Sequence, residues 1–157
     1  SYEKCTDLVN DLRIVNPDLV IFGIGINDAT AANFSVEDFV ARYKVLVSQV
    51  RSVNPSCALL FISNNDSFKK IRRKGYVVNT NGQLAEQGFL RLGKDCDAGV
   101  WNLFDIMGGL GSMRKWEAAG LAKRDKIHFT ETGYELVGDL LFNALMDKYM
   151  NHLKTSR

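Results

Sequence analysis

The stretch DLVIFGIGIND, residues 18–28, decides the fold of this chain. Its first six residues form a nearly continuous apolar run, which is what a parallel strand covered by helices on both faces requires. Gly23 and Gly25 have no side chains, so they let the backbone of the following loop approach a ligand closely. The polar pair Asn27-Asp28 follows the predicted strand. Because ligands bind at the carboxyl ends of strands in open α/β sheets, the stretch predicts a buried strand with a candidate site beside it.

Helical and strand patterns alternate along the rest of the chain. Apolar residues at helical spacing predict a helix over residues 3–15, which Asn16-Pro17 ends. Ser35 and Asp38 have capping-box-like spacing before a second long helix, and Thr130 is expected to cap the final helix. Further helices are predicted around residues 80–95 and 113–119, and buried strands over residues 57–62 and 100–104.

This alternation predicts an α/β fold with a parallel sheet. The pattern favours right-handed crossovers and a three-layer α/β/α sandwich. Three strands are few for such a sheet, which usually contains about five. We therefore expect residues 1–157 to be a single domain, the carboxyl-terminal part of a larger sandwich that here lacks its first two strands.

The composition is that of an ordinary globular protein. Of its 157 residues, 46% are hydrophobic and 24% are charged, and one domain of this length can bury a sizeable core. No apolar run approaches the roughly eighteen residues of a membrane helix. A net charge of +2 gives no strong reason to expect nucleic-acid or membrane partners. The sequence does not identify a compartment, although a secreted or periplasmic location fits it.

The cysteines and one basic run do not by themselves indicate a functional site. Cys5, Cys57 and Cys96 show neither metal-ligand spacing nor a redox motif, and the first two are expected to be small buried hydrophobes. The basic cluster within residues 69–74 is interpreted as a solvated loop. The alternative, a grip on an anionic substrate or polymer, stays open.

Two short polar motifs carry candidate chemistry. The side-chain amide of Asn27 can stabilise a developing oxyanion, worth about 3 kcal/mol in acyl transfer, although the motif can also be a simple turn. Asp125 and His128 lie three residues apart, so the carboxylate can orient the imidazole and leave Nε2 free to accept a proton. A surface histidine beside a charged loop is the alternative. The only other histidine, His152, is expected to be solvated near the chain end.

Three further residues are candidates for binding substrate. Gly25 allows close approach of the backbone, and Asn64 follows the second predicted strand at the edge where substrates bind. Trp116 can stack on a sugar ring. The structural alternatives are a polar turn for Asn64 and ordinary core packing for Trp116.

Residues 22–28 and 125–134 together resemble the third and fifth sequence blocks of the SGNH (GDSL-type) hydrolase family. The resemblance implies a flavodoxin-like sandwich and ester hydrolysis without a cofactor or metal. It makes His128 the general base, Asp125 its orienting partner and Asn27 an oxyanion-hole side chain. Residues 108–116 are also similar to some carbohydrate O-acetyl esterases of that family, so an O-acyl or O-acetyl group on a carbohydrate is the expected substrate.

The nucleophilic serine that the resemblance implies is absent from the chain. Ser63, Ser67 and Ser112 lack the strand-to-helix elbow that a nucleophile usually needs. We expect the amino-terminal segment of the same hydrolase domain to carry the serine. A non-catalytic carbohydrate-binding module on this scaffold is the main alternative, and a phosphate or nucleotide binder is a weaker one.

Overall fold

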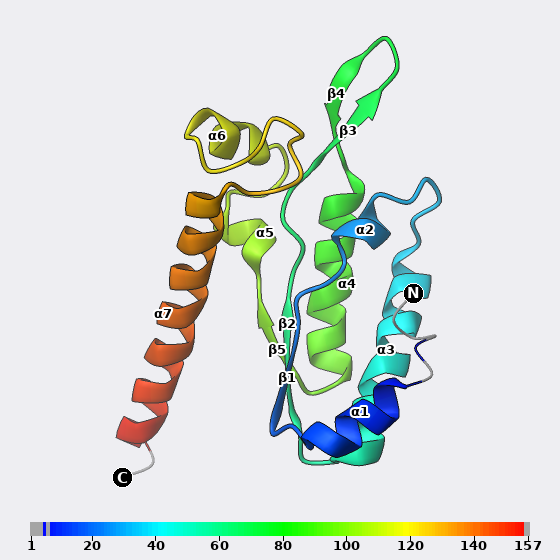
Figure 1. Cartoon of the computed structure of the whole chain (residues 1–157), viewed down its shortest axis with the longest axis vertical. Helices are drawn as coiled ribbons and strands as arrows, with labels where there is room; N and C mark the ends of the chain where they lie inside the picture. Colours follow the sequence, from blue (N-terminus) through cyan, green and yellow to red (C-terminus); the bar gives the residue numbers. More distant parts are fainter. Residues whose placement is uncertain (1–4, 6, 156–157) are drawn as a thin grey trace.

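The computed structural model describes residue 5 and residues 7–155 (Figure 1). Its centre is a parallel sheet in the order β1-β2-β5. The strands are β1 (Leu19–Phe22), β2 (Ala58–Ile62) and β5 (Gly99–Trp101). In the register, Phe22 pairs with Phe61 and Ile62 pairs with Trp101. The predicted parallel sheet is therefore confirmed, with its strand carboxyl ends at one edge.

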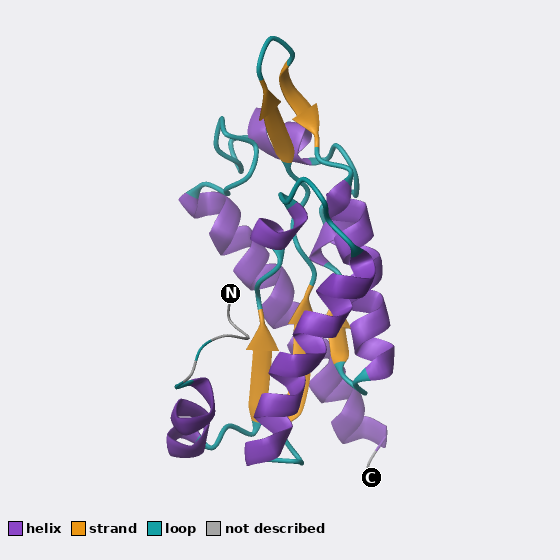
Figure 2. Cartoon of the chain, turned by 90° about the vertical axis from the view of Figure 1, so that its right-hand side faces the viewer, coloured by secondary structure: helices purple, strands orange, loops and turns teal. Residues whose placement is uncertain are grey.

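Helices cover the sheet on both faces and complete three layers (Figures 1 and 2). One face packs against α3 (Val36–Val53) and α4 (Asn81–Asp95), and α1 (Leu8–Val15) packs on α3. On the other face, α7 (Glu131–Thr155) contributes Val137, Leu140, Leu141 and Ala144 to a second core with Trp101 of β5. The α/β/α sandwich expected from the alternating pattern is thus the observed architecture.

Aromatic rings fill the core between the sheet and α3 and α4. Phe39, Phe61 and Phe89 are fully buried. Phe39 and Phe89 meet edge to face with ring centroids 5.1 Å apart, and Phe22 stacks on Phe61 at 5.0 Å. Such pairs add to the stabilisation that area burial provides, so this half of the core fixes how β1 and β2 meet α3 and α4.

Local signals decide where the helices begin. The Ser35 hydroxyl accepts a hydrogen bond from the Asp38 N–H at 3.2 Å, and the Thr130 hydroxyl accepts one from the Gly133 N–H at 3.2 Å. Both predicted caps are therefore confirmed. The first helix, predicted from residue 3, begins at Leu8, and residues 1–4 and 6 lie outside the described part of the chain.

Three predictions of local structure need correction. The basic run is a solvated loop only at residues 72–74, which form the exposed turn of an antiparallel hairpin of β3 (Phe68–Ile71) and β4 (Gly75–Val78), whereas Lys69 and Lys70 belong to β3. The strand expected to reach residue 104 ends at Trp101, since Asn102 caps the short helix α5 (Leu103–Ile106) through the Asp105 N–H. Cys5 is exposed rather than buried, whereas Cys57 is 4% exposed.

Two short helices complete the edge at which the parallel strands end. They are α2 (Ile26–Ala29), which follows β1, and α6 (Met113–Ala118), which follows a glycine-rich turn. Gly108, Gly109 and Gly111 in that turn all have positive φ, which explains why glycine recurs there. None of the described helices is long and apolar enough to cross a bilayer.

One side of the sandwich carries uncovered apolar surface. Within the described residues, β1 pairs only with β2, and its residues Leu19 and Ile21 are 46% and 44% exposed. A groove of about 310 Å³ runs between α1 and β1, lined mainly by apolar side chains. The large exposed apolar residues of α7 are Tyr134, Leu136, Phe142, Leu145, Met146, Tyr149, Met150 and Leu153. The free edge of β1 therefore has apolar surface on the side of α1, and α7 carries further exposed apolar side chains.

Candidate active site

A cavity of about 260 Å³ lies at the carboxyl ends of β1 and β2. The loop after β1 contributes Gly23 and Ile24, and the loop after β2 contributes Asn64 and Asn65. Opposite them lies Phe129, which directly follows His128. The remaining lining residues are Ile26, Ile62, Ser63, Leu103, Tyr134 and Val137. The cavity thus adjoins both polar motifs that the sequence singled out.

Asp125 organises the turn that carries His128. Its Oδ1 accepts hydrogen bonds from the N–H groups of Ile127 at 2.9 Å and His128 at 3.0 Å. Its Oδ2 lies 2.9 Å from Nδ1 of the His128 ring. Lys126, between them, has a φ of 58°, a left-handed conformation that turns both N–H groups toward the carboxylate. One carboxylate therefore holds both the backbone and the ring of His128.

The ionisation of Asp125 fixes the tautomer of the ring. Burial raises the pKa of Asp125, but hydrogen bonds from His128 and Ile127 outweigh it and lower the pKa to about 2. The carboxylate has no proton to give at neutral pH, so Nδ1 of His128 must be the donor. Nε2 has no hydrogen-bond partner among the described residues, and the side chain is 59% exposed. The arrangement can therefore accept a proton at Nε2.

Asn27 lies in the first turn of α2 and is exposed. Its side-chain amide makes no hydrogen bond within the described part of the chain, whereas its carbonyl accepts from the N–H and the hydroxyl of Thr30. The next residue, Asp28, is held by Arg42 at 3.1 Å and by the Tyr43 hydroxyl at 3.4 Å. The turn is therefore anchored to α3 while the amide of Asn27 is available to a ligand.

Gly25 is buried beneath this turn rather than open to the cavity. Its φ is +131°, and a Cβ built there would lie 2.7 Å from Cζ of Phe89. The residue therefore lets the chain pass directly over the Phe89 ring and then turn into α2. Gly25 therefore determines where α2, which carries Asn27, begins.

Asn64 and Trp116 are also built into the structure. Asn64 lines the cavity but is 5% exposed, and its amide donates to the carbonyls of Asn65 at 3.0 Å and Gly82 at 3.4 Å. Trp116 donates its indole N–H to the carbonyl of Met107 at 3.0 Å, and its ring packs on Phe129 at 5.2 Å. Trp116 thus supports the residue beside His128 and belongs to the second core.

The position of Asn65 and Asp66 directly after a buried strand indicates the rim of the site, but the sequence did not predict the contacts by which they build it. The Asn65 amide donates to the carbonyl of Ile127 at 2.8 Å. Asp66 is completely buried and accepts a hydrogen bond from the Met113 N–H at 2.9 Å. Burial raises the pKa of Asp66 despite that hydrogen bond. The signal was a polar run directly after a buried strand, but its partners are remote in sequence.

The serines of this region are buried in the core. Ser63, Ser67 and Ser112 are at most 3% exposed. The Ser63 hydroxyl donates to Oδ1 of Asn102 and accepts from the Phe104 N–H, both at 2.9 Å. No serine hydroxyl of the described residues bonds to His128. Among the same residues, no group of three or more His, Cys, Asp or Glu side chains is placed to hold a metal ion.

Comparisons with known proteins bear on this geometry. The sequence profile of the GDSL-like lipase/acylhydrolase family matches residues 5–136. A peptidoglycan O-acetylesterase structure superposes with a TM-score of 0.81 at 27% identity, covering 90% of this chain and 41% of that one. An acetyl xylan esterase gives a TM-score of 0.68 at 19% identity, covering 91% and 74% of the two chains. A lipase/acylhydrolase from Enterococcus faecalis gives 0.60 at 20% identity, covering 90% and 68%.

These matches differ in how much of each compared chain they cover and in sequence identity. The chain spans less than half of the peptidoglycan O-acetylesterase, and the two matches at 20% identity or less establish the fold alone. None of the curated proteins shows significant sequence similarity to the chain. The α/β/α fold with its parallel sheet is the fold of these esterase structures.

Proposed function

The chain belongs to the GDSL-like lipase/acylhydrolase family, and from this premise we propose that it supplies the acid–base half of a serine-type ester hydrolase. The observation that carries the proposal is the 2.9 Å contact between Nδ1 of His128 and Asp125, which leaves Nε2 open. In this proposal His128 is the general base and Asp125 its orienting partner. Asn27 is the side-chain donor of the oxyanion hole.

The chemistry follows from these positions. Nε2 of His128 takes the proton of a serine hydroxyl as its oxygen attacks the ester carbonyl, and the amide of Asn27 donates to the resulting oxyanion. The imidazolium then gives its proton to the departing alcohol, which leaves an acyl-serine. Water, deprotonated by the same imidazole, releases the carboxylic acid and restores the serine. Ionised Asp125 stabilises the imidazolium in both halves of the cycle.

The serine comes, in this proposal, from an amino-terminal strand–helix segment of the same hydrolase domain. The free edge of β1 offers unpaired backbone groups, which another strand can satisfy. The groove lined by Leu12, Val15 and Ile21 and the exposed apolar side of α7 provide surface for its side chains. A strand parallel to β1 has its carboxyl end at the same end of the sheet as β1. The cavity lies at that end, and Phe129, the residue after His128, lines it.

The proposed substrate is an O-acyl or O-acetyl group on a carbohydrate. Support comes from the peptidoglycan O-acetylesterase, the compared structure with 27% identity to this chain. The cavity of about 260 Å³ at the strand ends suits a short acyl group better than a long one. The non-catalytic carbohydrate-binding module remains the second candidate, and the uncommitted Nε2 of His128 argues against it.

The test uses the complete hydrolase, this chain together with its amino-terminal segment, with p-nitrophenyl acetate as substrate. We expect His128→Ala to lower kcat by at least about a thousandfold and Asn27→Ala by roughly a hundredfold or more. His152→Ala, the other histidine, is the matched control and keeps full turnover. Unchanged turnover in His128→Ala would rule out the mechanism and leave the binding module.

A labelling experiment tests the source of the nucleophile. A fluorophosphonate reacts with activated serines, so we expect its adduct on the amino-terminal segment of the complete hydrolase. Ser63, Ser67 and Ser112 stay unlabelled because their hydroxyls are buried. An adduct on any of these three serines would contradict the assignment of the nucleophile to another segment.

A further inference from the structure

The basic residues of the chain are concentrated beside the candidate site. Residues 67–85, which contain the β3–β4 hairpin, carry five basic and no acidic residues. Residues 113–128, which contain α6 and the His128 turn, carry five basic and two acidic residues. These segments together have a net charge of +8, whereas the whole chain has +2, so the remainder has −6. The charge separation is therefore much larger than the net charge suggests.

Most of these charges are not neutralised within the protein. We call the following residues the basic surface: Lys69, Lys70, Arg72, Arg73, Lys74, Arg114, Lys115, Lys123 and Arg124. None of them has a carboxylate partner within 4.0 Å among the described residues, whereas Lys126 is paired with Glu117. Cations without a carboxylate partner attract anions from solution.

The hairpin is fixed against the turn that carries His128. The Phe68 N–H donates to the carbonyl of Lys126 at 3.0 Å. The Arg114 guanidinium lies 5.2 Å from the centroid of the Phe68 ring, and the Lys126 ammonium lies 5.1 Å from that of Tyr76. Lys70 pairs with Tyr76 across the hairpin, so both residues lie on the face that meets this turn. The basic surface therefore continues from the hairpin to the candidate site.

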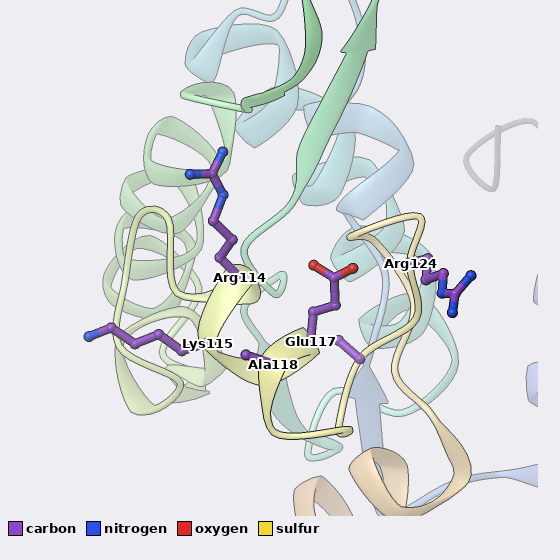
Figure 3. Close-up of a pocket in the computed structure, with 6 residues that line it drawn as sticks. Arg114, Lys115, Glu117, Ala118 and Arg124 are labelled. Carbon is purple, nitrogen blue, oxygen red and sulfur yellow. The ribbon is translucent and has the colours of Figure 1, made fainter.

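A depression next to the hairpin gives this surface a shape. It has a volume of about 690 Å³ and is lined by Arg114, Lys115 and Arg124 together with Glu117 and two alanines. Figure 3 shows Arg114 and Glu117 projecting to the same side of α6, while Lys115 and Arg124 point away on opposite sides. The two guanidinium groups of the depression therefore point in different directions.

We propose that the basic surface binds an acidic polysaccharide and presents its ester groups to His128. This inference rests on the proposed ester hydrolysis and specifies its substrate class: an acylated glycan that carries carboxylates. The aromatic rings of the hairpin are covered by other side chains. This favours a glycan over single-stranded nucleic acid, because base stacking needs rings with an open face. Phe68 is 2% exposed beneath Arg114, and Tyr76 lies against Lys126.

Binding tests the proposal without relying on catalysis. The probe is a fluorescent oligogalacturonate titrated with the 157-residue chain, and neutral xylo-oligosaccharide is the uncharged counterpart. The hairpin variant combines Lys70→Gln, Arg72→Gln and Lys74→Gln. The matched control combines Lys94→Gln, Lys148→Gln and Lys154→Gln, three exposed residues at the far ends of α4 and α7 (Figure 1). Each variant changes the net charge from +2 to −1.

We expect the chain to bind oligogalacturonate and not xylo-oligosaccharide, and to release it as salt screens the charges. The hairpin variant should bind about tenfold more weakly, equivalent to about 1.4 kcal/mol, while the control binds as the wild type does. Equal loss in both variants, no binding of oligogalacturonate, or tighter binding of an oligonucleotide or an anionic vesicle would overturn the proposal. His128→Ala separates the two levels: it should keep oligogalacturonate binding even though the proposed ester hydrolysis is lost.

Discussion

The side-chain amide of Asn65 donates a hydrogen bond to the carbonyl of Ile127 at 2.8 Å, across 62 residues of sequence. This bond joins the loop after β2 to the turn that carries His128, at the residue just before the histidine. The same amide also donates to the carbonyl of Asp66 at 2.8 Å, so the loop itself is held in shape. The position of the imidazole therefore depends on a residue that makes no contact with the ring.

Asn65→Ala removes this tie, and we expect kcat of the complete hydrolase for p-nitrophenyl acetate to fall roughly tenfold to a hundredfold. A misplaced general base costs that much because proton transfer needs near-ideal geometry. The KM should change little, since Asn65 acts through the backbone of the turn. Initial rates over a range of ester concentrations give both constants.

Asn54→Ala is the matched control, because the Asn54 amide also donates to a remote backbone carbonyl, that of Pro17 at 3.1 Å. It lies at the amino-terminal ends of the strands. Both variants should lose about 1 kcal/mol of unfolding free energy, but only Asn65→Ala should lose kcat. Equal kcat losses would show that general destabilisation, and not the position of His128, explains the effect.

The lowered pKa of Asp125 predicts a pH dependence of stability. Its pKa of about 2 in the folded protein lies below the ordinary aspartate value of 3.8, so the ionised group contributes its full stabilisation at pH values above 3.8. This contribution is lost as pH falls from about 4 towards 2. Urea unfolding at several pH values should show that the stability difference between the wild type and Asp125→Asn shrinks over this window.

Asp139→Asn is the control for that experiment. Asp139 is exposed on α7 and makes no hydrogen bond or ion pair with the described residues. Its stability should follow that of the wild type at every pH. A stability difference for Asp125→Asn that stays constant from pH 5 to 2 would contradict the hydrogen-bonded carboxylate that orients His128.

Two glycines of α7 should respond to alanine in opposite ways. A Cβ at Gly133 would lie 1.9 Å from the carbonyl oxygen of Leu121, which accepts the Thr130 N–H that closes the turn around His128. A Cβ at Gly138 meets nothing within 4 Å. We expect Gly133→Ala to lower the free energy of unfolding by about 2 kcal/mol, because the added methyl group overpacks the turn. Gly138→Ala should raise it by about 0.5–1 kcal/mol, because alanine has the higher helix propensity. Thermal and urea unfolding measure both, and a stabilised Gly133→Ala would show that the turn can shift freely.

Local patterns predicted what local physics decides. The three-residue spacing of Asp125 and His128 sufficed for the ring contact, because both partners share one turn. The capping spacing of Ser35 and Asp38 likewise produced the observed bond. The apolar run in residues 18–23 predicted a buried parallel strand, and β1 is indeed parallel to β2. The prediction of burial was wrong for Leu19 and Ile21, which are 46% and 44% exposed, because within the described residues no element covers them.

What the sequence did not predict depends on partners that are remote along the chain. The hairpin was not predicted, because the charge pattern of the basic run indicates a loop. The pairing of Lys70 with Tyr76 and the packing of Phe68 into the core stabilise the strands despite these charges. Cys5 is exposed because the first helix begins only at Leu8, so the residue lies outside the helical stripe from which its burial was predicted. The bond from Asn65 to Ile127 joins two loops, and no pattern within either loop encodes it.

The place of Trp116 in the core gives the last prediction. Its indole N–H bonds to the Met107 carbonyl and its ring packs on Phe129, so we expect both Trp116→Ala and Trp116→Phe to lower stability. The alanine variant should cost about 3 kcal/mol from lost packing, and the phenylalanine variant about 1–2 kcal/mol, since it keeps the ring contact but leaves the carbonyl unpaired.

The kinetic readout separates this core role from sugar stacking. If Trp116 supports Phe129, the complete hydrolase with Trp116→Phe keeps its KM for an acetylated polysaccharide, and any loss in kcat is shared with p-nitrophenyl acetate. If Trp116 stacks on the sugar, KM for the polysaccharide rises in Trp116→Ala while KM for p-nitrophenyl acetate and the unfolding free energy stay as in the wild type. The hydrogen bond to Met107 favours the first outcome, because a ring fixed by its N–H and covered by Phe129 has little free face for a sugar.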